Sequence, residues 1–185
     1  KLFHQIIVVD GGSTDGTIEW TKQNNYELYI QKKKGFRHAY NEVLPFVKGD
    51  AIITFSPDGN SIAELLPNLI SKFEEGYDMV IVSRYLETAK SYDDDFITAF
   101  GNWLFTKTIN ILHGGKYTDA MVIYRAYKKQ IIYDLELQKE DGYRLAEKLF
   151  STQISWEPLL SVRAAKKKLK VAEIPGDEPD RIGGE

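Results

Sequence analysis

Polar side chains suited to binding a cation follow an apolar run near the middle of the chain. Residues 51–55 read AIITF, and residues 56–60 read SPDGN. The proline, the glycine and the short polar side chains of SPDGN end the apolar run, which predicts a buried strand followed by an acidic turn. In an open α/β sheet, ligands bind outside the carboxyl ends of the strands. We therefore expect Asp58 to lie where an anion or a metal ion binds.

A second acidic segment follows the first strand-like run. Residues 5–9 read QIIVV, which predicts a strand, and DGGSTDGT follows at 10–17. Thr14 or Asp15 can cap the helix that comes next. A carboxylate at Asp10, followed by glycines, can approach a ligand closely and accept hydrogen bonds from a base or a ribose. An ordinary strand-to-helix turn explains the same residues, and the segment matches neither a Walker loop nor the fingerprint G-x-G-x-x-G.

Basic and amide side chains occur close to these turns. Arg84 follows the apolar run at 78–82, and an arginine at the end of a strand is suited to binding phosphate. Lys34 and Arg37 stand in a basic turn and could attract a diphosphate, although a solvated surface is the ordinary explanation for such a charge run. Asn41 is a poor helix former inside the next predicted helix, which makes it a candidate for a contact.

An unusually apolar segment occupies residues 96–112, which read FITAFGNWLFTKTINIL and carry one charge, at Lys107. It is too short to span a bilayer and too apolar for an ordinary surface helix. A core helix is the first expectation, and an interfacial helix or a wall for an apolar acceptor are the alternatives. We expect the three aspartates at 93–95 to form a solvated loop or a helix N-terminus rather than a metal site.

The elements that must position these residues alternate between strand-like and helix-like patterns. This alternation predicts one α/β domain over residues 1–185. Beyond the first strand and its helix, the expected strands are 26–30, 51–55, 78–82, 120–126 and 171–175, the expected helices are 38–47, 62–75, 96–112 and 156–165, and residues 129–155 form a mostly helical region.

Composition narrows the classes of function. The 185 residues are 43% hydrophobic and 28% charged, which suits one globular domain with a sizeable core. A formal net charge of −3 argues against nucleic acid as the main partner. The absence of cysteine excludes disulfides, thiolate metal ligands and a cysteine nucleophile, and it suits a reducing, cytoplasmic setting. No apolar run is long enough to predict a membrane-spanning helix.

Four segments in order carry a resemblance to a known family: VVDGGSTDGT, TFSPDGN, VSRY, and TDAMVIYRAY together with EIPGDEPDRIGG. They resemble the inverting nucleotide-sugar glycosyltransferases of the GT-A fold, particularly the dolichyl-phosphate mannose synthases and the bacterial polyprenyl-phosphate glycosyltransferases of cell-envelope biogenesis. The resemblance covers nearly the whole chain. It implies a Rossmann-like GT-A fold with a central, mostly parallel sheet flanked by helices, and it suggests truncation at both ends.

The resemblance implies a site for the nucleotide-sugar donor. Asp10 and Asp15 fall in the family motif that holds the base and the ribose, and Gly11 replaces the second aspartate of that motif. Gly35 and Asn41 match a helix start that borders the nucleotide. The residues that match family contacts to the diphosphate or to the acceptor phosphate are Arg84, Arg125 and Arg181.

The same resemblance implies a site for Mg²⁺ or Mn²⁺. The segment at 56–60 takes the place of the family's Asp-x-Asp motif, with Ser56 instead of the first carboxylate and with Asp58 and Asn60 as oxygen ligands. Magnesium is usually held by one or two protein carboxylates together with substrate phosphates and waters. Asp58, Asn60 and a donor diphosphate could therefore suffice.

The activity implied is transfer of a hexose, with inversion, to a polyprenyl phosphate, by an enzyme that is cytoplasmic or peripheral at the inner face of the membrane. A phosphate acceptor is already an anionic nucleophile, whereas a hydroxyl acceptor would need a general base, for which Asp119, Asp141 and Glu157 are candidates in that order. The expected catalytic residues are Asp119, the first candidate for this base, and Arg125, one of the expected phosphate contacts.

Two other functions remain open. One is transfer to a saccharide hydroxyl during polysaccharide synthesis, and the other is nucleotide binding without catalysis, which Gly11 and Ser56 would suit. A nucleotidyltransferase is disfavoured because no glycine loop bearing lysine and arginine follows the first strand. An exposed apolar platform at 96–112 would favour the lipid acceptor over the saccharide.

Overall fold

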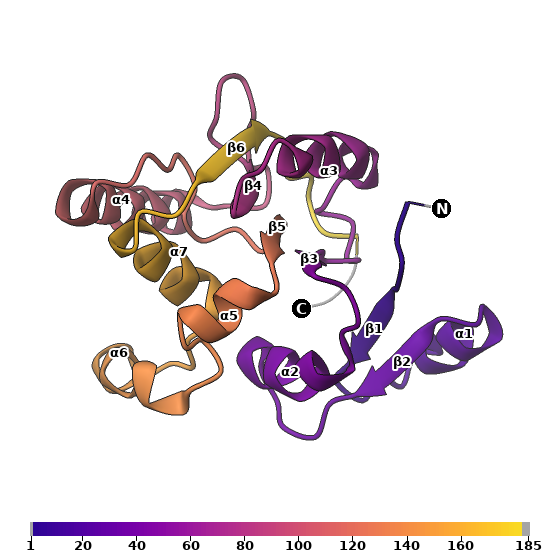
Figure 1. Ribbon diagram of the computed structural model, residues 1–185. Helices are drawn as coiled ribbons and strands as arrows, with labels where there is room; N and C mark the ends of the chain where they lie inside the picture. The colour runs from indigo at the N-terminus through magenta and orange to yellow at the C-terminus, as the bar shows by residue number, and fades with distance from the viewer. Residues whose placement is uncertain (1, 183–185) are drawn as a thin grey trace. The chain divides into compact units, whose positions relative to one another are not determined.

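A computed structural model describes residues 2–182 and contains two compact units (Figure 1). The first unit comprises residues 1–50 and 138–156, and the second comprises residues 51–137 and 157–185. The expectation of one domain over the whole chain stays a prediction.

The first unit is built on two parallel strands, with Ile7 opposite Glu27 in register. Its other elements are helices, and Gly16 and Gly35 stand immediately before two of them with φ of 95° and 101°, a conformation that glycine adopts without strain. The elements are β1 (Ile7–Asp10), α1 (Thr17–Gln23), β2 (Glu27–Ile30), α2 (Phe36–Val43), and α6 (Arg144–Phe150), with 3₁₀ turns at Leu44–Phe46 and Glu140–Gly142.

The second unit contains a four-stranded sheet in the order β3-β5-β4-β6. Its strands are β3 (Ala51–Thr54), β4 (Met79–Ser83), β5 (Arg125–Lys128) and β6 (Val171–Pro175). Strand β5 is antiparallel to both β3 and β4, whereas β6 is parallel to β4. β3, β4 and β6 therefore run in the same direction, and their carboxyl ends lie at one edge of the sheet.

Helices cover this sheet and supply much of its core. They are α3 (Leu66–Glu74), α4 (Phe96–His113), α5 (Gln130–Asp134) and α7 (Trp156–Lys166), with a 3₁₀ turn at Ala63–Leu65 before α3. All five residues of β4 are buried, and Leu69, Ile132 and Leu160 of the covering helices are almost fully buried as well. Burying such a side chain stabilises the fold by about 1.5–3 kcal/mol relative to exposing it.

The predicted alternation of strands and helices is confirmed, and the differences have local causes. The helix expected at 38–47 is α2, which ends at Val43 because Pro45 has no backbone N–H to donate. The strand expected at 120–126 begins only at Arg125. The carbonyl groups of Ala120 and Val122 accept hydrogen bonds from the Arg125 side chain, so this segment is a loop instead of a ladder strand.

Helix α4 begins and ends as its flanking residues predict. The Asp95 carboxylate accepts a hydrogen bond from the Thr98 N–H at 2.7 Å, and this hydrogen bond lowers the pKa of Asp95. The helix ends at His113, followed by Gly114 in the left-handed conformation. Within residues 2–182, no helix combines the length and the apolar character that a membrane crossing requires.

Candidate active site

The acidic turn after β3 lies at the edge where the carboxyl ends of β3, β4 and β6 meet. Asp58 keeps 23% of its side chain exposed, and its Oδ1 accepts a hydrogen bond from the Asn60 N–H at 3.3 Å. Asn60 is buried, and its Nδ2 donates to Glu178 Oε1 at 3.4 Å. The two expected metal ligands therefore stand in one turn, next to the segment that follows β6.

Arg84, directly after β4, forms a buried ion cluster with three carboxylates. Its Nε and Nη2 donate to the two oxygens of Asp119 at 2.6 and 3.1 Å. Its Nη1 lies 2.9 Å from Glu178 Oε2 and 3.1 Å from Asp94 Oδ2. Such charge-assisted, bidentate contacts hold a guanidinium in one orientation. The structure thus brings Arg84 to the same edge as Asp58 and Asn60, linked through Glu178.

The charges of this cluster stabilise each other. Burial alone would raise the pKa of Asp119, but hydrogen bonds from Arg84 and Asn102 and the Arg84 charge outweigh it, so the pKa lies below its usual range. Burial would lower the pKa of Arg84, and Asp119 and Glu178 raise it instead. A general base works best with a pKa near the operating pH. The geometry argues against Asp119 as that base and makes it the residue that positions Arg84.

Arg125, the other expected catalytic residue, is fully buried in the second unit. Its Nε donates to the Val122 carbonyl at 2.9 Å, and its Nη1 donates to Ser161 Oγ at 3.1 Å. Its Nη2 donates to the Ala120 carbonyl at 3.4 Å. Substrate contact would require these bonds to break. In this structure Arg125 fixes the loop before β5, which argues against a direct catalytic role.

Arg181 is the expected phosphate-binding arginine that faces solvent, with about half of its side chain exposed. Its Nε lies 3.0 Å from Asp93 Oδ2 and 3.7 Å from Asp58 Oδ2. An accessible cation therefore stands beside the candidate metal ligand. The aspartates at 93–95 do not converge on one point, because Asp93 contacts Arg181, Asp94 contacts Arg84 and Asp95 caps α4.

In the first unit, Asp10 follows β1 and is buried. Its Oδ1 accepts hydrogen bonds from the N–H groups of Gly12 and Ser13, both at 2.7 Å. Burial raises the pKa of Asp10, but these hydrogen bonds outweigh that effect and the net pKa is lowered. Asp15 is exposed and accepts hydrogen bonds from the Thr17 N–H and hydroxyl. The two aspartates order the glycine-rich turn, which is the ordinary structural explanation.

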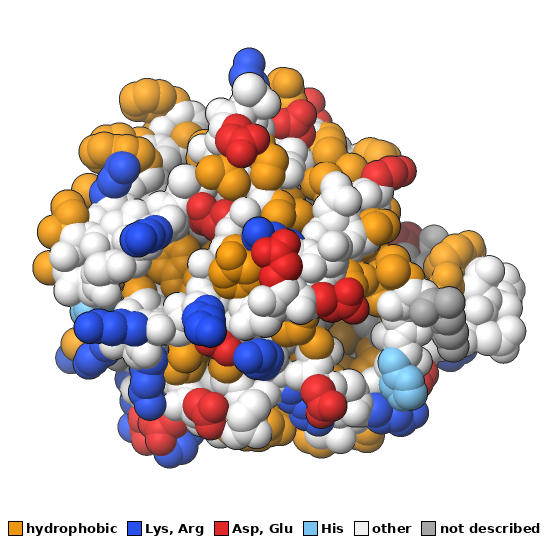
Figure 2. All heavy atoms as spheres, turned by 45° about the horizontal axis from the view of Figure 1, so that its top comes forward, with side chains coloured by type: hydrophobic (Ala, Val, Ile, Leu, Met, Phe, Trp, Pro, Cys, Tyr) orange, Lys and Arg blue, Asp and Glu red, His pale blue; other side chains and the backbone are white. Residues whose placement is uncertain are grey.

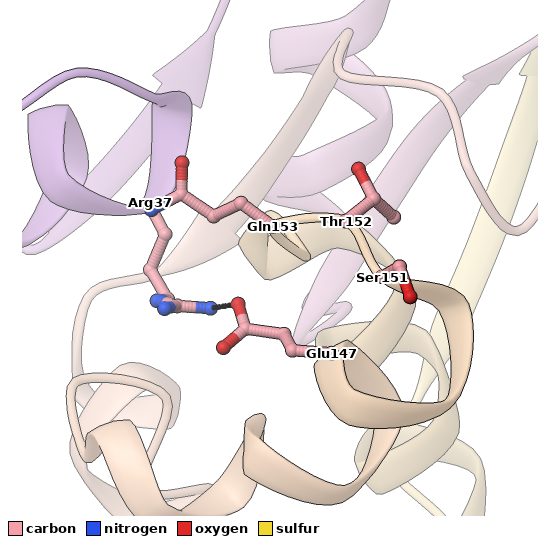
Figure 3. A pocket seen from close by; sticks show the side chains of 5 residues that line it. All are labelled: Arg37, Glu147, Ser151, Thr152 and Gln153. Carbon is pink, nitrogen blue, oxygen red and sulfur yellow. Dashed lines mark hydrogen bonds and ion pairs between the residues drawn. The ribbon is translucent and has the colours of Figure 1, made fainter.

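Two shallow cavities of about 340 Å³ occur in the first unit. Asp15, Gly16, Thr17 and Trp20 line one of them, so the expected donor residue Asp15 borders an open hollow. The other, shown in Figure 3, is lined by Arg37, Glu147, Ser151, Thr152 and Gln153.

The cavity that Arg37 lines adjoins the start of α2. The guanidinium of Arg37 points to the carboxylate of Glu147 (Figure 3) and also contacts Glu140 at 2.9 Å. Arg37 is buried in these ion pairs, so the structure argues against the suggestion that it attracts a diphosphate. A Cβ on Gly35 would meet the side chain of Gln153, which can move aside, so it is the φ of 101° that favours glycine at this position. Asn41 Nδ2 donates to Glu140 Oε1 at 3.2 Å.

Helix α4 has its polarity reversed relative to an ordinary surface helix. Asn102 and Thr106 face the fold, where Asn102 Nδ2 donates to Asp119 Oδ1 at 2.9 Å and Thr106 Oγ1 accepts from the Ala120 N–H at 3.2 Å. Apolar side chains face outward, among them the stacked rings of Phe100 and Trp103. The exposed apolar side chains of α4 are Phe96, Ile97, Phe100, Trp103, Leu104, Ile111 and Leu112.

These seven side chains form what we call the α4 platform. Figure 2 shows hydrophobic side chains gathered on the left of the view, where α4 lies in Figure 1. The expectation of a core helix is wrong for this face, because most of its large apolar side chains are exposed. The sequence alone could not decide this, since a buried helix and an interfacial helix share the same composition.

Comparison with known proteins identifies the family. Residues 1–136 match the profile of glycosyl transferase family 2. The chain belongs to this family. Among curated relatives, glycosyltransferase AglJ of Haloferax volcanii is 25% identical over 174 residues, covering 94% of this chain and 53% of that protein. The dolichyl-phosphate hexose transferase of the same organism is 24% identical over 179 residues, covering 97% and 72%.

A third relative is the undecaprenyl-phosphate 4-deoxy-4-formamido-L-arabinose transferase of Shewanella sediminis, which is 25% identical over 136 residues, covering 70% of this chain and 40% of that protein. The chain thus spans about half the length of two of these three relatives. Glucosyl-3-phosphoglycerate synthase from Mycobacterium tuberculosis, solved with Mn²⁺, UDP-glucose and phosphoglyceric acid, has a TM-score of 0.60 at 14% identity, covering 98% of this chain and 62% of that one. The likeness shows the shared fold, and the predicted GT-A fold is confirmed.

The donor atoms at the end of β3 fit a divalent ion that is shared with a substrate. Within residues 2–182 there is no group of three or more histidine, cysteine, aspartate or glutamate side chains arranged to hold a metal ion. The described side chains at this edge therefore do not complete the coordination of a metal ion by themselves. The Asp58 carboxylate and the Asn60 amide oxygen suit Mg²⁺ or Mn²⁺ when diphosphate oxygens complete the coordination.

Proposed function

We propose that this family 2 chain transfers a hexose from a nucleoside-diphosphate sugar to a polyprenyl phosphate, with inversion. The observation that carries the proposal is the α4 platform, because a lipid acceptor requires an apolar surface and a saccharide acceptor does not. The names of two relatives, which include dolichyl-phosphate and undecaprenyl-phosphate, support the same acceptor class.

The candidate site residues have different roles toward the donor and the acceptor. The family resemblance assigns Asp10 and Asp15, in the first unit, to the base and ribose of the donor, and it assigns Gly35 and Asn41 to the border of the nucleotide. Arg181 binds a diphosphate or acceptor phosphate oxygen, because its guanidinium is accessible beside Asp58. Arg84 is paired with Asp94, Asp119 and Glu178, so its role is to hold these carboxylates and the segments that carry them at the edge where β3 and β4 end.

Asp58 and Asn60 would hold Mg²⁺ or Mn²⁺, which neutralises charge on the departing nucleoside diphosphate. An oxygen of the acceptor phosphate attacks the anomeric carbon while the bond from that carbon to the diphosphate oxygen breaks. The acceptor phosphate is already ionised, so the chain needs no general base. This suits the lowered pKa and full burial of Asp119.

A transfer assay tests the proposal. The purified chain is incubated with UDP-, GDP- or dTDP-hexoses and a short polyprenyl phosphate, with and without Mn²⁺ or Mg²⁺. We expect one donor to yield a lipid-linked hexose and an equal amount of nucleoside diphosphate in a metal-dependent reaction. Product with a saccharide hydroxyl acceptor alone would support polysaccharide synthesis instead, and donor binding without turnover would support a nucleotide-binding module.

The α4 platform also predicts peripheral contact with a bilayer. We expect the double substitution Phe100→Ser and Trp103→Ser to lower partitioning onto phosphatidylglycerol-containing vesicles about tenfold or more, since two exposed aromatic rings would lose apolar burial. Cosedimentation measures the partition coefficient. Leu145→Ser, at an exposed leucine of α6, is the control and should leave partitioning unchanged. Equal partitioning of the double variant and the wild type would refute membrane contact through α4.

A further inference from the structure

The side chain of Arg181 joins two carboxylates that come from different loops. Its Nε lies 3.0 Å from Asp93 Oδ2, in the loop before α4, and 3.7 Å from Asp58 Oδ2, in the turn after β3. Both carboxylates are about three-quarters buried, whereas half of the arginine side chain is exposed. The guanidinium therefore provides a positive charge that faces Asp58.

The segment that carries Arg181 is fastened upstream. The Glu178 N–H donates to the Lys90 carbonyl at 2.9 Å, and the Tyr92 N–H donates to the Glu178 carbonyl at 2.8 Å. The Glu178 side chain is held in turn by Arg84 at 2.9 Å. Residues 176–178 are thus tied to the buried ion cluster.

Beyond Glu178 the attachment is lighter. The Ile182 N–H donates to the Asp58 carbonyl at 2.8 Å, and the Ile182 side chain lies against Gly59, where a Cβ would come within 2.7 Å of it. Among the described residues, Arg181 lies between the anchor at Glu178 and the backbone hydrogen bond of Ile182, so its exposed side chain can move without disturbing the core. Movement of Arg181 would change the exposure of the Asp58 carboxylate, because its Nε lies 3.7 Å from Asp58 Oδ2.

We propose that Arg181 is a latch that competes with the divalent cation for Asp58. In the closed state, Arg181 neutralises Asp58 and Asp93. In the open state, the cation takes Asp58, and electrostatic repulsion turns Arg181 toward the donor diphosphate, the anion that then lies beside it. This inference rests on the proposed function, because it uses the metal site of the transferase. The latch adds one step to that function, in which the divalent cation replaces the Arg181 guanidinium at Asp58.

The latch predicts that removing Arg181 tightens binding of the metal alone. Arg181→Gln should lower the dissociation constant for Mn²⁺ without nucleotide roughly two- to fivefold, which is the scale of a solvent-exposed ion pair. Electron paramagnetic resonance of free Mn²⁺ measures this constant directly. Lys90→Gln is the matched control, because Lys90 is an exposed lysine on the neighbouring loop and its loss changes the net charge equally. It should change the constant by less than about 1.5-fold.

In the transfer assay, the same Arg181→Gln variant should raise the KM for the donor, since the diphosphate loses a partner. Tighter metal binding together with weaker donor binding is the signature of the latch. Unchanged or weaker Mn²⁺ binding by Arg181→Gln would overturn it, as would equal tightening by Lys90→Gln. If the wild-type chain transfers hexose and the variants give either of these results, the latch is overturned and the proposed function stands. A wild-type chain that neither binds Mn²⁺ nor transfers hexose overturns the proposed function.

Discussion

Asp58→Asn should lower kcat/KM for hexose transfer roughly 10²–10³-fold, as expected when a main electrostatic contact to the leaving group is lost. Asparagine keeps the shape of the side chain and its acceptor oxygen but removes the negative charge that attracts a divalent ion. Asp58 is the carboxylate at the end of β3 in the position of the family's metal motif, where Ser56 supplies no second charge. The measurement is the initial rate of nucleoside-diphosphate release at subsaturating donor.

Asp50→Asn is the matched control, because Asp50 is an exposed carboxylate immediately before β3. It should retain activity within about twofold of the wild type, and thermal unfolding of both variants should show an intact fold. Higher Mn²⁺ concentrations should partly restore the Asp58→Asn rate, since weak binding is overcome by mass action. Activity of Asp58→Asn within threefold of the wild type at limiting Mn²⁺ would rule out Asp58 as the principal metal ligand.

Arg84→Ala should lower the free energy of unfolding by about 3–5 kcal/mol, because it leaves buried carboxylates without their counter-ion. Asp119 is fully buried, and both of its oxygens accept hydrogen bonds from Arg84. Glu178 and Asp94 lose the same partner. Urea denaturation at pH 7 measures the effect. Arg144→Ala is the control, since the Arg144 contact with Asp141 is exposed and its loss should barely change stability.

The stability difference between the wild type and Arg84→Ala should shrink on acidification. In the wild type, the pKa of Asp119 lies below its ordinary value of 3.8, so its stabilising contribution is present above that value and is lost as the pH falls through the lowered pKa. In the variant, the buried carboxylate lacks a counter-ion, so its pKa is raised and protonation relieves the strain as the pH falls. A difference that is constant between pH 7 and pH 4 would contradict the assignment.

The sequence predicted the order of the elements and the edge at which Asp58 and Arg84 stand. Strand ends marked by SPDGN and SRY are local signals, and the rule that ligands bind at the carboxyl ends of strands needs no coordinates. In the structure, β3, β4 and β6 run in the same direction, so their carboxyl ends lie at one edge, as the rule requires.

The partners of the predicted site residues could not be read from the sequence. Arg84 meets carboxylates from three separate segments, at Asp94, Asp119 and Glu178, and no local pattern links them. Composition also gave no means of distinguishing Arg125, whose donors go to carbonyl groups and Ser161, from Arg181, which faces solvent. Long-range packing decides which arginine a substrate can reach.

Helix α4 packs against the fold through polar side chains and presents apolar side chains on its outer face. The inner side chains, Asn102 and Thr106, maintain the hydrogen bonds to Asp119 and Ala120, while Phe100 and Trp103 make their ring contact on the outside. The outer face can therefore be redesigned with polar residues while the hydrogen bonds of Asn102 and Thr106 are preserved. The rate of such a variant with a water-soluble acceptor would report the chemistry apart from delivery of the lipid.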